Sequence, residues 1–288
     1  MTAVVFRQRP PDNGAMSSFP ILCGSIASHA SQVGQQVHND LYQALGLNYS
    51  YVAFRVTDGP EAIRAMRALE IRGFGVSMPH KETIMSHLDT IDPVAREIGA
   101  VNTVVNDDGV LTGYNFDWLG VVRAVEEMGT TIERQRTVVV GAGGAARAAA
   151  FGLKKRGASN VTIFNRTIER GKRLARNLGV NFGGDLSHLN ADYDILVHAT
   201  SAGHPSQPGV CVIPTEILTP GKIVFDVVCE PLPTPLQERA TEAGCTTAPG
   251  YRMRLHQAAA QFELYTGVTP PLDAMGTLLL EAMGLETP

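Results

Sequence analysis

Residues 137–166 read TVVVGAGGAARAAAFGLKKRGASNVTIFNR, and this stretch decides the fold of the second half of the chain. An apolar run ends at Gly141, a helix-forming segment follows the glycines, and a second apolar run ends at Phe164. A strand, a glycine turn, a helix and a strand within about 30 residues form a βαβ unit of the size that binds dinucleotides. The stretch therefore predicts a parallel sheet of the Rossmann type.

The glycine spacing in this stretch is the form that a dinucleotide-binding turn requires. Gly141-x-Gly143-x-x-Ala146 matches the pattern G-x-G-x-x-G/A. Gly141 allows the tight turn, Gly143 lets a pyrophosphate approach the backbone, and small Ala146 lets the helix pack close to its strand. Free N–H groups at the helix start then meet the phosphate charge. The alternative is a purely structural turn. The residues assigned to this site are Gly141, Ala142, Gly143, Gly144 and Ala145.

The end of the second apolar run indicates which dinucleotide binds. A site for NAD places a carboxylate about 20 residues after the glycines, where it holds the ribose 2′-hydroxyl. This chain has Asn165, Arg166 and Thr167 at that place, and Arg170 follows. Arginine binds a 2′-phosphate through charge-assisted, forked hydrogen bonds. These four residues therefore predict NADP as the cofactor, and the alternative is a solvated basic helix start.

Composition excludes several other classes of protein. The chain has 288 residues, a net charge of −4 and no basic run, so we expect no nucleic-acid partner. No apolar stretch approaches the roughly 20 residues of a membrane span, and we expect no secretion signal. The four cysteines form no C-x-x-C pair and the histidines lack metal-ligand spacing. We therefore expect reduced thiols, no metal and a cytoplasmic protein.

The first half of the chain also alternates between strand and helix patterns, but it lacks the nucleotide glycines. Residues 1–19 are expected to form a loose leader and the polar segment 25–36 a loop. The other expected elements are strands at 19–24, 49–56 and 73–78, a hairpin at 101–114, helices from 38, 58 and 115, strands at 194–198 and 223–228, and helices from 234, 253 and 271.

This alternation predicts an α/β fold in two domains. We place an α/β substrate domain at 1–114 and the Rossmann-type NADP-binding domain at 115–249. The helices at about 250–288 follow the last strand of the second domain. We expect them to return to the first domain and complete it.

Two polar residues at turns of the first half are candidates for chemistry. Lys81 follows a strand end and a proline, and Asp117 opens the helix that leads into the second domain. An ammonium and a carboxylate brought together can pass a proton to or from an alcohol as a hydride leaves or arrives. Each residue alone is more often an ordinary surface group, and spacing in the sequence does not show that they meet.

Eight short motifs run through the chain in a fixed order. They are VSMPHK at 76–81, AVNT at 100–103, NFD at 115–117, GAGGAAR at 141–147, NRT at 165–167, ATSAG at 199–203, QAA at 257–259 and QFELYT at 261–266. With these motifs the chain resembles the shikimate/quinate dehydrogenase family over nearly its whole length. It is most similar to the divergent branch called shikimate dehydrogenase-like, in which a Gly-x-x-x-His-Asn motif, here 34–39, replaces a serine motif.

The resemblance implies an active site in the cleft between the two domains and a reversible, NADP-dependent oxidation of a ring hydroxyl to a ketone. It implies that Lys81 and Asp117 are the catalytic pair. Substrate contacts are implied at Ser77, Asn102 and Gln257, with Gln32 as a further candidate. Further cofactor contacts are assigned to Thr200, Val227 and Gly250.

The chain departs from the family where the substrate carboxylate is bound. The two serines of the family's Ser-x-Ser loop fall on Gln32 and Gly34, an asparagine falls on Gly75, and a tyrosine falls on Cys229. Each lost partner of a buried carboxylate costs about 1–3 kcal/mol. Replacement donors could come from the glutamine amides of the same loop or from Arg252, Arg254 and His256; otherwise these are ordinary surface residues.

Together these features predict an oxidoreductase acting on shikimate or a related cyclic hydroxy acid, with weak activity on shikimate itself and a role in aromatic amino acid biosynthesis. A quinate or aminoshikimate-type dehydrogenase is the alternative enzyme. A catalytically silent NADP-binding sensor is the alternative from another class. We expect a monomer or a homodimer.

Overall fold

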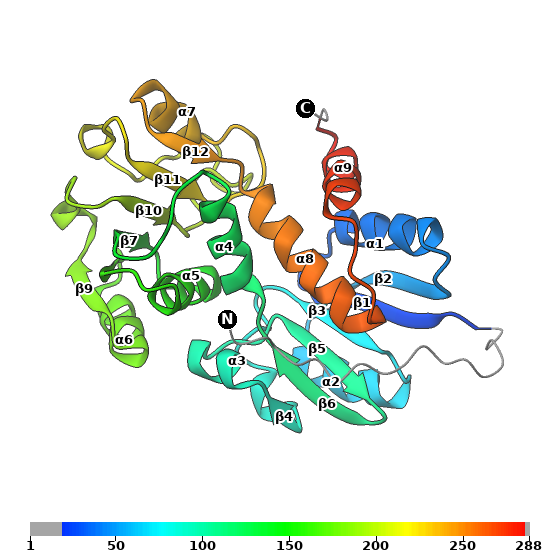
Figure 1. Ribbon diagram of the computed structural model, residues 1–288. Coiled ribbons are helices and arrows are strands. Elements are labelled where there is room, and N and C mark those ends of the chain that lie inside the picture. The colour runs from blue at the N-terminus through cyan, green and yellow to red at the C-terminus, as the bar shows by residue number, and fades with distance from the viewer. Residues whose placement is uncertain (1–18, 286–288) are drawn as a thin grey trace. The chain divides into compact units, whose positions relative to one another are not determined.

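The computed structural model describes residues 19–285, so the predicted leader lies outside the described residues except for Phe19. The chain divides into two compact units (Figure 1). The first comprises Met1–Phe116 and Ala258–Pro288, and the second comprises Asp117–Gln257. The chain passes from one unit to the other between Phe116 and Asp117, and it returns within α8 (Tyr251–Thr266).

The first unit is built on a mixed sheet with the strand order β2-β1-β3-β5-β6-β4. β1 pairs in parallel with β2 and β3, whereas β5 is antiparallel to β3 and β6. The strands are β1 (Ile21–Ala27), β2 (Tyr49–Arg55), β3 (Gly73–Val76), β4 (Thr90–Ile91), β5 (Thr103–Asp107) and β6 (Val110–Tyr114). The helices of this unit are α1 (Gln32–Ala44), α2 (Gly59–Ala68), α3 (Pro93–Ile98), α9 (Leu272–Ala282), the short η1 (Met85–His87) and the part of α8 from Ala258 onward.

Local sequence signals account for several of these boundaries. Asp58 caps α2 by accepting a hydrogen bond from the Glu61 N–H at 2.9 Å, as predicted. The predicted hairpin is present, and its turn contains Asp108 and Gly109 at positive φ. Asn106 closes the turn, because its side-chain Oδ1 accepts a hydrogen bond from the Gly109 N–H.

The polar segment 25–36 was expected to be a loop, and this holds for residues 28–31 but is wrong for both ends of the segment. β1 continues to Ala27, and α1 begins at Gln32 with Ser31 as its N-cap. β1 lies between two parallel partners, so its buried Ile26 gains both ladder hydrogen bonds and core packing. These tertiary contacts outweigh the polar character of the segment.

The C-terminal helices belong to the first unit because their buried face packs on its sheet. The Tyr265 ring covers Gly73 of β3 so closely that a Cβ on this glycine would lie 2.3 Å from it. Gln261 donates to the Thr103 hydroxyl at 2.8 Å, and Arg72 donates to the Tyr265 carbonyl at 3.2 Å. α9 in turn packs against α1.

The second unit confirms the predicted Rossmann-type architecture. Its six strands are all parallel, in the order β12-β11-β10-β7-β8-β9. This is the doubly wound order, with the chain reversing direction across the sheet between β7 and β10. The strands are β7 (Arg136–Val140), β8 (Asn160–Phe164), β9 (Asn181–Gly184), β10 (Ile195–His198), β11 (Ile223–Asp226) and β12 (Thr246–Ala248).

Four helices accompany this sheet, and their buried faces are rich in small and aliphatic residues. They are α4 (Asp117–Glu126), α5 (Gly144–Lys155), α6 (Ile168–Leu178) and α7 (Pro235–Glu242). Two short helices, η2 (Leu186–His188) and η3 (Thr215–Ile217), lie in the connections before and after β10. α4 packs closely on α5, as Gly152 shows: a Cβ at this position would lie 2.9 Å from the Val122 side chain. Across the described residues, 19–285, no helix combines the length and apolar character that a membrane crossing needs.

Candidate active site

The turn after β7 has the backbone geometry that its first glycine was predicted to provide. Gly141 has φ +125°, a conformation that favours glycine. A Cβ at this position would lie 2.6 Å from the Ala199 carbonyl oxygen, so the chain also needs glycine here for space. The Gly141 N–H donates to the Phe164 carbonyl at 2.9 Å, which ties the turn to the end of β8.

Gly143 differs from Gly141 because none of the described residues requires it to be a glycine. Its φ is −87°, and a Cβ there would meet no atom of residues 19–285 within 4 Å. It is the N-cap of α5, and as a glycine it has no side chain with which to cap the helix. The first N–H groups of α5 therefore lack an N-cap acceptor of their own, and this fits the pyrophosphate of a dinucleotide.

The end of β8 carries the residues predicted to select NADP. Arg166 is exposed and lines a hollow of about 240 Å³ together with Asp185, Leu186 and Ser187. The side chains of Ser187 and His188 hold the pKa of the Asp185 carboxyl below its usual range. The same hydrogen bonds direct this carboxylate toward its own neighbours. The Arg166 guanidinium therefore stays available to an anion in the hollow.

Two neighbours of Arg166 shape the turn. Asn165 donates through its amide to the Thr167 carbonyl at 2.8 Å. Arg170 donates through Nε to the Ala142 carbonyl at 3.0 Å, so this arginine braces the glycine turn from α6. The bracing role is one that the sequence alone did not reveal.

The predicted cofactor residues on the other side of the glycine turn follow β10, β11 and β12. Thr200 comes two residues after the end of β10, and its Oγ1 accepts from the Ala202 N–H at 3.1 Å. Val227 follows β11, and its N–H donates to the His198 carbonyl at 3.0 Å. Gly250 follows β12 so tightly that a Cβ would lie 2.2 Å from the Val228 carbonyl oxygen. All three therefore lie at the carboxyl end of the parallel sheet, where open α/β sheets bind ligands.

Lys81 lies in a turn of the first unit that is anchored on both sides. Ser77 is held by its N–H, which donates to the Ile26 carbonyl at 2.9 Å, and the His80 N–H donates to the Ser77 carbonyl at 3.0 Å. The Lys81 carbonyl accepts from the Val101 N–H at 2.8 Å. Lys81 itself is half-buried, so its position is defined while its side chain still reaches the surface.

His80 has a structural role beside Lys81. The ring is 3% exposed, and its Nε2 lies 3.0 Å from the Val56 carbonyl oxygen. Its other edge faces Gly59, where a Cβ would lie 2.8 Å from the ring nitrogen Nδ1. The histidine therefore packs the turn against the start of α2.

Asn102 links the predicted site in the first unit to the start of α4. Its Oδ1 accepts from the Thr103 hydroxyl at 2.8 Å and from the Phe116 N–H at 2.9 Å. Phe116 directly precedes Asp117, which is 1% exposed and begins α4. A carboxylate in the first turn of a helix is stabilised by the helix dipole. Lys81 belongs to the first unit and Asp117 to the second.

The expected carboxylate end is occupied by aromatic residues that the sequence did not single out. A Cβ on Gly75 would lie 3.1 Å from the Tyr51 hydroxyl and 3.5 Å from the Gln261 amide nitrogen. Tyr51 stacks on His38, with ring centroids 4.2 Å apart. Burial lowers the pKa of His38 to about 4, so this ring is uncharged near neutral pH. The tyrosine therefore fills the space that a longer residue at 75 would need.

The glutamines of the segment 32–36 lie in α1, and one of them has a structural contact. Gln35 uses its Oε1 to accept the Ala53 N–H at 2.9 Å, which ties α1 to β2. Gln32 is exposed at the start of α1, and Gln257 is half-buried within α8. A side chain at Gly34 would meet no atom within 4 Å, so packing does not exclude the family's serine there.

The basic residues of α8 have acidic partners, so the suggested anion-binding role is not supported. Arg252 and His256 both contact Glu127, at 3.7 and 2.7 Å. Arg254 lies 3.9 Å from Glu230. These ion pairs join α8 to the end of α4 and to the loop after β11, within the second unit.

These elements define a class of protein, an α/β oxidoreductase with a dinucleotide-binding unit and a separate substrate unit. Three family models match the chain: the shikimate dehydrogenase substrate binding domain at residues 25–104, shikimate / quinate 5-dehydrogenase at 123–208, and the shikimate 5′-dehydrogenase C-terminal domain at 250–278. The chain belongs to the shikimate dehydrogenase family of enzymes, as the sequence motifs predicted.

Individual relatives cover the chain nearly from end to end. Shikimate dehydrogenase (NADP(+)) of Moorella thermoacetica is 40% identical over 283 residues, which is 94% of this chain and 95% of the relative. A shikimate dehydrogenase crystallised with NADP⁺ is 35% identical, with a TM-score of 0.85 over 91% of this chain and 95% of its own. The ligand-free 5-ketofructose reductase of Gluconobacter sp. strain CHM43 is 31% identical, with a TM-score of 0.83 over 92% and 99%.

Proposed function

We propose that this protein catalyses reversible, NADP-dependent hydride transfer between NADP and a ring hydroxyl of shikimate or a related cyclic hydroxy acid. The observation that carries the proposal is the glycine turn, in which the uncapped start of α5 and the open face of Gly143 fit a pyrophosphate while Arg166 stands at the end of β8. The relative from Moorella, at 40% identity, is named for NADP and shikimate and supports both choices.

The two parts of the chain have separate tasks in this proposal. Residues 1–114 together with about 250–288 bind the substrate, and residues 115–249 bind NADP. The cofactor is bound at the carboxyl end of the second sheet, where open α/β sheets bind ligands.

Lys81 and Asp117 act on the proton of the reacting hydroxyl. Bound NADP supplies or accepts the hydride. Lys81 donates a proton to the oxygen that gains negative charge during reduction, and Asp117 holds the hydroxyl and orients the lysine. Asn102 keeps the entry to α4 in place through its bond to the Phe116 N–H, so it supports the position of Asp117 as well as contacting the substrate.

The remaining substrate contacts come from Ser77, Asn102, Gln257 and Gln32. Shikimate is expected to bind weakly, because the positions where the family resemblance implies donors to its carboxylate are Gly34, Gly75 and Cys229 in this chain. The Cys229 thiol is a poor substitute for a tyrosine hydroxyl, since a thiol is a weak donor and this one already points to the Val227 carbonyl oxygen at 3.6 Å. A second candidate substrate is therefore a polyhydroxylated ketone without a carboxylate, a class to which the named substrate of the Gluconobacter relative belongs.

Turnover assays with a substrate panel test the proposal. We expect NADPH formation with NADP⁺ and shikimate at a kcat/KM below about 10⁴ M⁻¹s⁻¹. The panel contains shikimate, quinate, aminoshikimate and, with NADPH in the reverse direction, 5-ketofructose. A shikimate efficiency above that range would contradict the rebuilt carboxylate end. NADP⁺ binding without turnover of any compound would favour the sensor, which the presence of Lys81 and Asp117 argues against.

Selection for NADP over NAD is tested at Arg166. We expect Arg166→Ala to raise the dissociation constant of NADP⁺ by roughly ten- to a hundredfold, the value of a charge-assisted contact. The dissociation constant of NAD⁺ should stay within about twofold, because NAD⁺ has no 2′-phosphate. Arg173→Ala, an exposed change in the helix that follows Arg166, α6, is the matched control and should affect neither ligand. Equal loss of both dinucleotides in calorimetric titrations would remove Arg166 from the phosphate site.

The cellular setting follows from the same reaction. We propose a cytoplasmic enzyme that serves aromatic amino acid biosynthesis and works as a monomer or homodimer. A soluble-fraction assay and light scattering test these assignments.

A further inference from the structure

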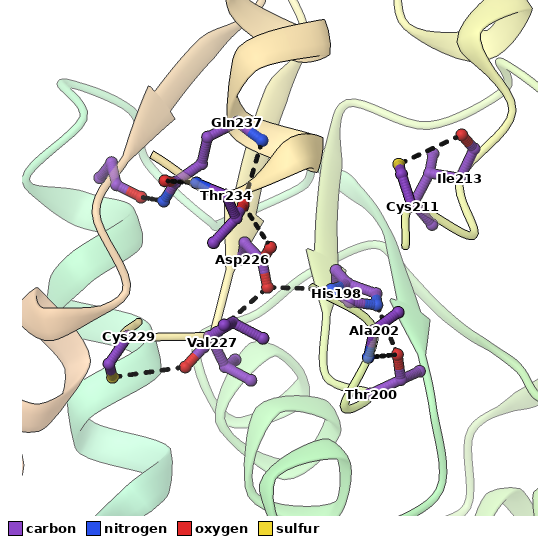
Figure 2. Close-up of polar contacts among 12 residues, drawn as sticks. His198, Thr200, Ala202, Cys211, Ile213, Asp226, Val227, Cys229, Thr234 and Gln237 are labelled. Carbon is purple, nitrogen blue, oxygen red and sulfur yellow. Dashed lines mark hydrogen bonds and ion pairs between the residues drawn. The ribbon is translucent and has the colours of Figure 1, made fainter. Parts of the chain in front are cut away.

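A buried polar chain joins the ends of β10 and β11 in the second unit (Figure 2). His198 and Asp226 are the last residues of these neighbouring parallel strands and are directly paired in register. They are 2% and 1% exposed, and His198 Nδ1 lies 2.9 Å from Asp226 Oδ1. The far nitrogen, Nε2, lies 2.6 Å from the Thr200 hydroxyl oxygen. This row of hydrogen bonds therefore runs from Asp226, inside the sheet, through His198 to Thr200, in the loop assigned to the cofactor.

The donors around Asp226 fix the direction of these hydrogen bonds. The Val228 N–H can only donate, and it points to Asp226 Oδ1 at 3.1 Å. The Thr234 hydroxyl accepts from the Gln237 N–H, so its own proton goes to Asp226 Oδ2 at 2.7 Å. Both carboxylate oxygens are acceptors, and His198 must therefore donate from Nδ1. In the neutral ring this leaves a lone pair at Nε2, which accepts the proton of the Thr200 hydroxyl.

Thr200 is left with one site for a ligand. Its proton points to His198, and one lone pair accepts from the Ala202 N–H at 3.1 Å. A hydroxyl oxygen has two lone pairs, so the second one is available at the surface of the loop. Thr200 can therefore accept a hydrogen bond from a ligand but has no proton to offer to one.

The sheet order shows which part of a dinucleotide reaches Thr200. A dinucleotide crosses the sheet at the switch point between β7 and β10. Arg166, at the end of β8, lies on the side of the adenosine 2′-phosphate. The loop after β10 lies on the opposite side of the glycine turn, where the nicotinamide half is placed.

We propose that His198 and Asp226 are positioning residues that orient Thr200 as an acceptor for a donor group of the nicotinamide half, either a ribose hydroxyl or the carboxamide N–H. The inference rests on the proposed function and deepens it. The pyrophosphate of the dinucleotide, which has no proton to donate at neutral pH, is excluded from this position. The alternative is that the pair only ties β10, β11 and the capping box of α7 together, and it predicts no difference between ligands.

Ligand titration with two probes separates these possibilities. We expect Thr200→Val to weaken NADP⁺ binding roughly three- to tenfold, the effect of one lost hydrogen bond. Adenosine 2′,5′-bisphosphate, which lacks the nicotinamide half, should bind the variant as it binds the wild type. Thr200→Ser should restore NADP⁺ binding. The matched control is Thr241→Val, at an exposed threonine of α7 whose hydroxyl contacts only the Thr247 hydroxyl among the described residues.

Imidazole ¹⁵N spectra of the ligand-free wild type test the direction of the chain independently of any ligand. We expect His198 to carry its proton on Nδ1 and to show a bare Nε2. A ring protonated on Nε2, or on both nitrogens, would overturn the proposal, and so would equal weakening of both probes by Thr200→Val. Failure of the wild type to bind either probe would instead refute the proposed function.

Discussion

Replacing Lys81 with alanine is expected to lower kcat by about 10²-fold or more while leaving the dissociation constant of NADP⁺ within about twofold. The reason is that a positioned general acid contributes typically 10²–10⁴-fold to a proton-transfer step. The cofactor, by contrast, is bound by the other unit. The Lys81 carbonyl, which anchors the turn through the Val101 N–H, is retained in the variant. Steady-state kinetics and calorimetric titration measure the two quantities on the same preparation.

Glu82→Ala is the matched control, since Glu82 is an exposed charged residue in the same turn. It should keep kcat within about twofold. Lys81→Arg retains the charge but has a pKa too high for proton transfer, so we expect it to remain impaired. A Lys81→Ala variant with wild-type kcat would remove this lysine from the mechanism.

Gly143→Ala is expected to raise the dissociation constant of NADP⁺ by roughly 10²-fold with little loss of folding stability. In the folded chain the added methyl group would meet no atom within 4 Å, and the φ of −87° suits alanine. The cost to the free protein is that of a poorer N-cap, about 1 kcal/mol or less. The methyl group would, however, lie where the pyrophosphate approaches the backbone. Thermal unfolding and NADP⁺ titration together separate the two effects.

Gly141→Ala gives the contrasting pattern. Its Cβ would lie 2.6 Å from the Ala199 carbonyl oxygen, and its φ of +125° is strained for alanine. We therefore expect it to lose stability as well as affinity. If Gly143→Ala lowered the melting temperature as much as Gly141→Ala and left NADP⁺ binding unchanged, the ligand role of Gly143 would be refuted.

The second unit was predictable because its decisive contacts are local in sequence. Strand, glycine turn, helix and strand follow one another from Thr137 to Arg166, and each step has its own residue signal. The extension of β1 and the start of α1 were missed, because their stability comes from β2, β3 and the core rather than from residues 25–36 themselves. The short β4 and β9 carry too few residues to show a period.

The residues of the candidate site also differ in whether their neighbours are close in the sequence or come from distant elements. The glycines and Arg166 were assigned from their spacing within one βαβ unit, and their contacts with the cofactor stay predictions. His198 and Asp226 could not be found in this way, because only the pairing of two parallel strands places residues 28 positions apart side by side. The packing beside Gly75 could not be found either, because its neighbours Tyr51 and Gln261 come from β2 and α8. The roles of Lys81, Asp117, Gln32 and Gln257 stay predictions, because they depend on how a substrate is held.

The way the chain leaves and re-enters the first unit has a consequence for its synthesis. The second unit is an insertion whose last residue, Gln257, is made before the final segment of the first unit. Until these residues are made, the surface of β3 around Gly73 lacks its contact with Tyr265, and α1 lacks its contact with α9. The second unit is therefore synthesised in full while the N-terminal sheet still lacks the C-terminal helices that cover it.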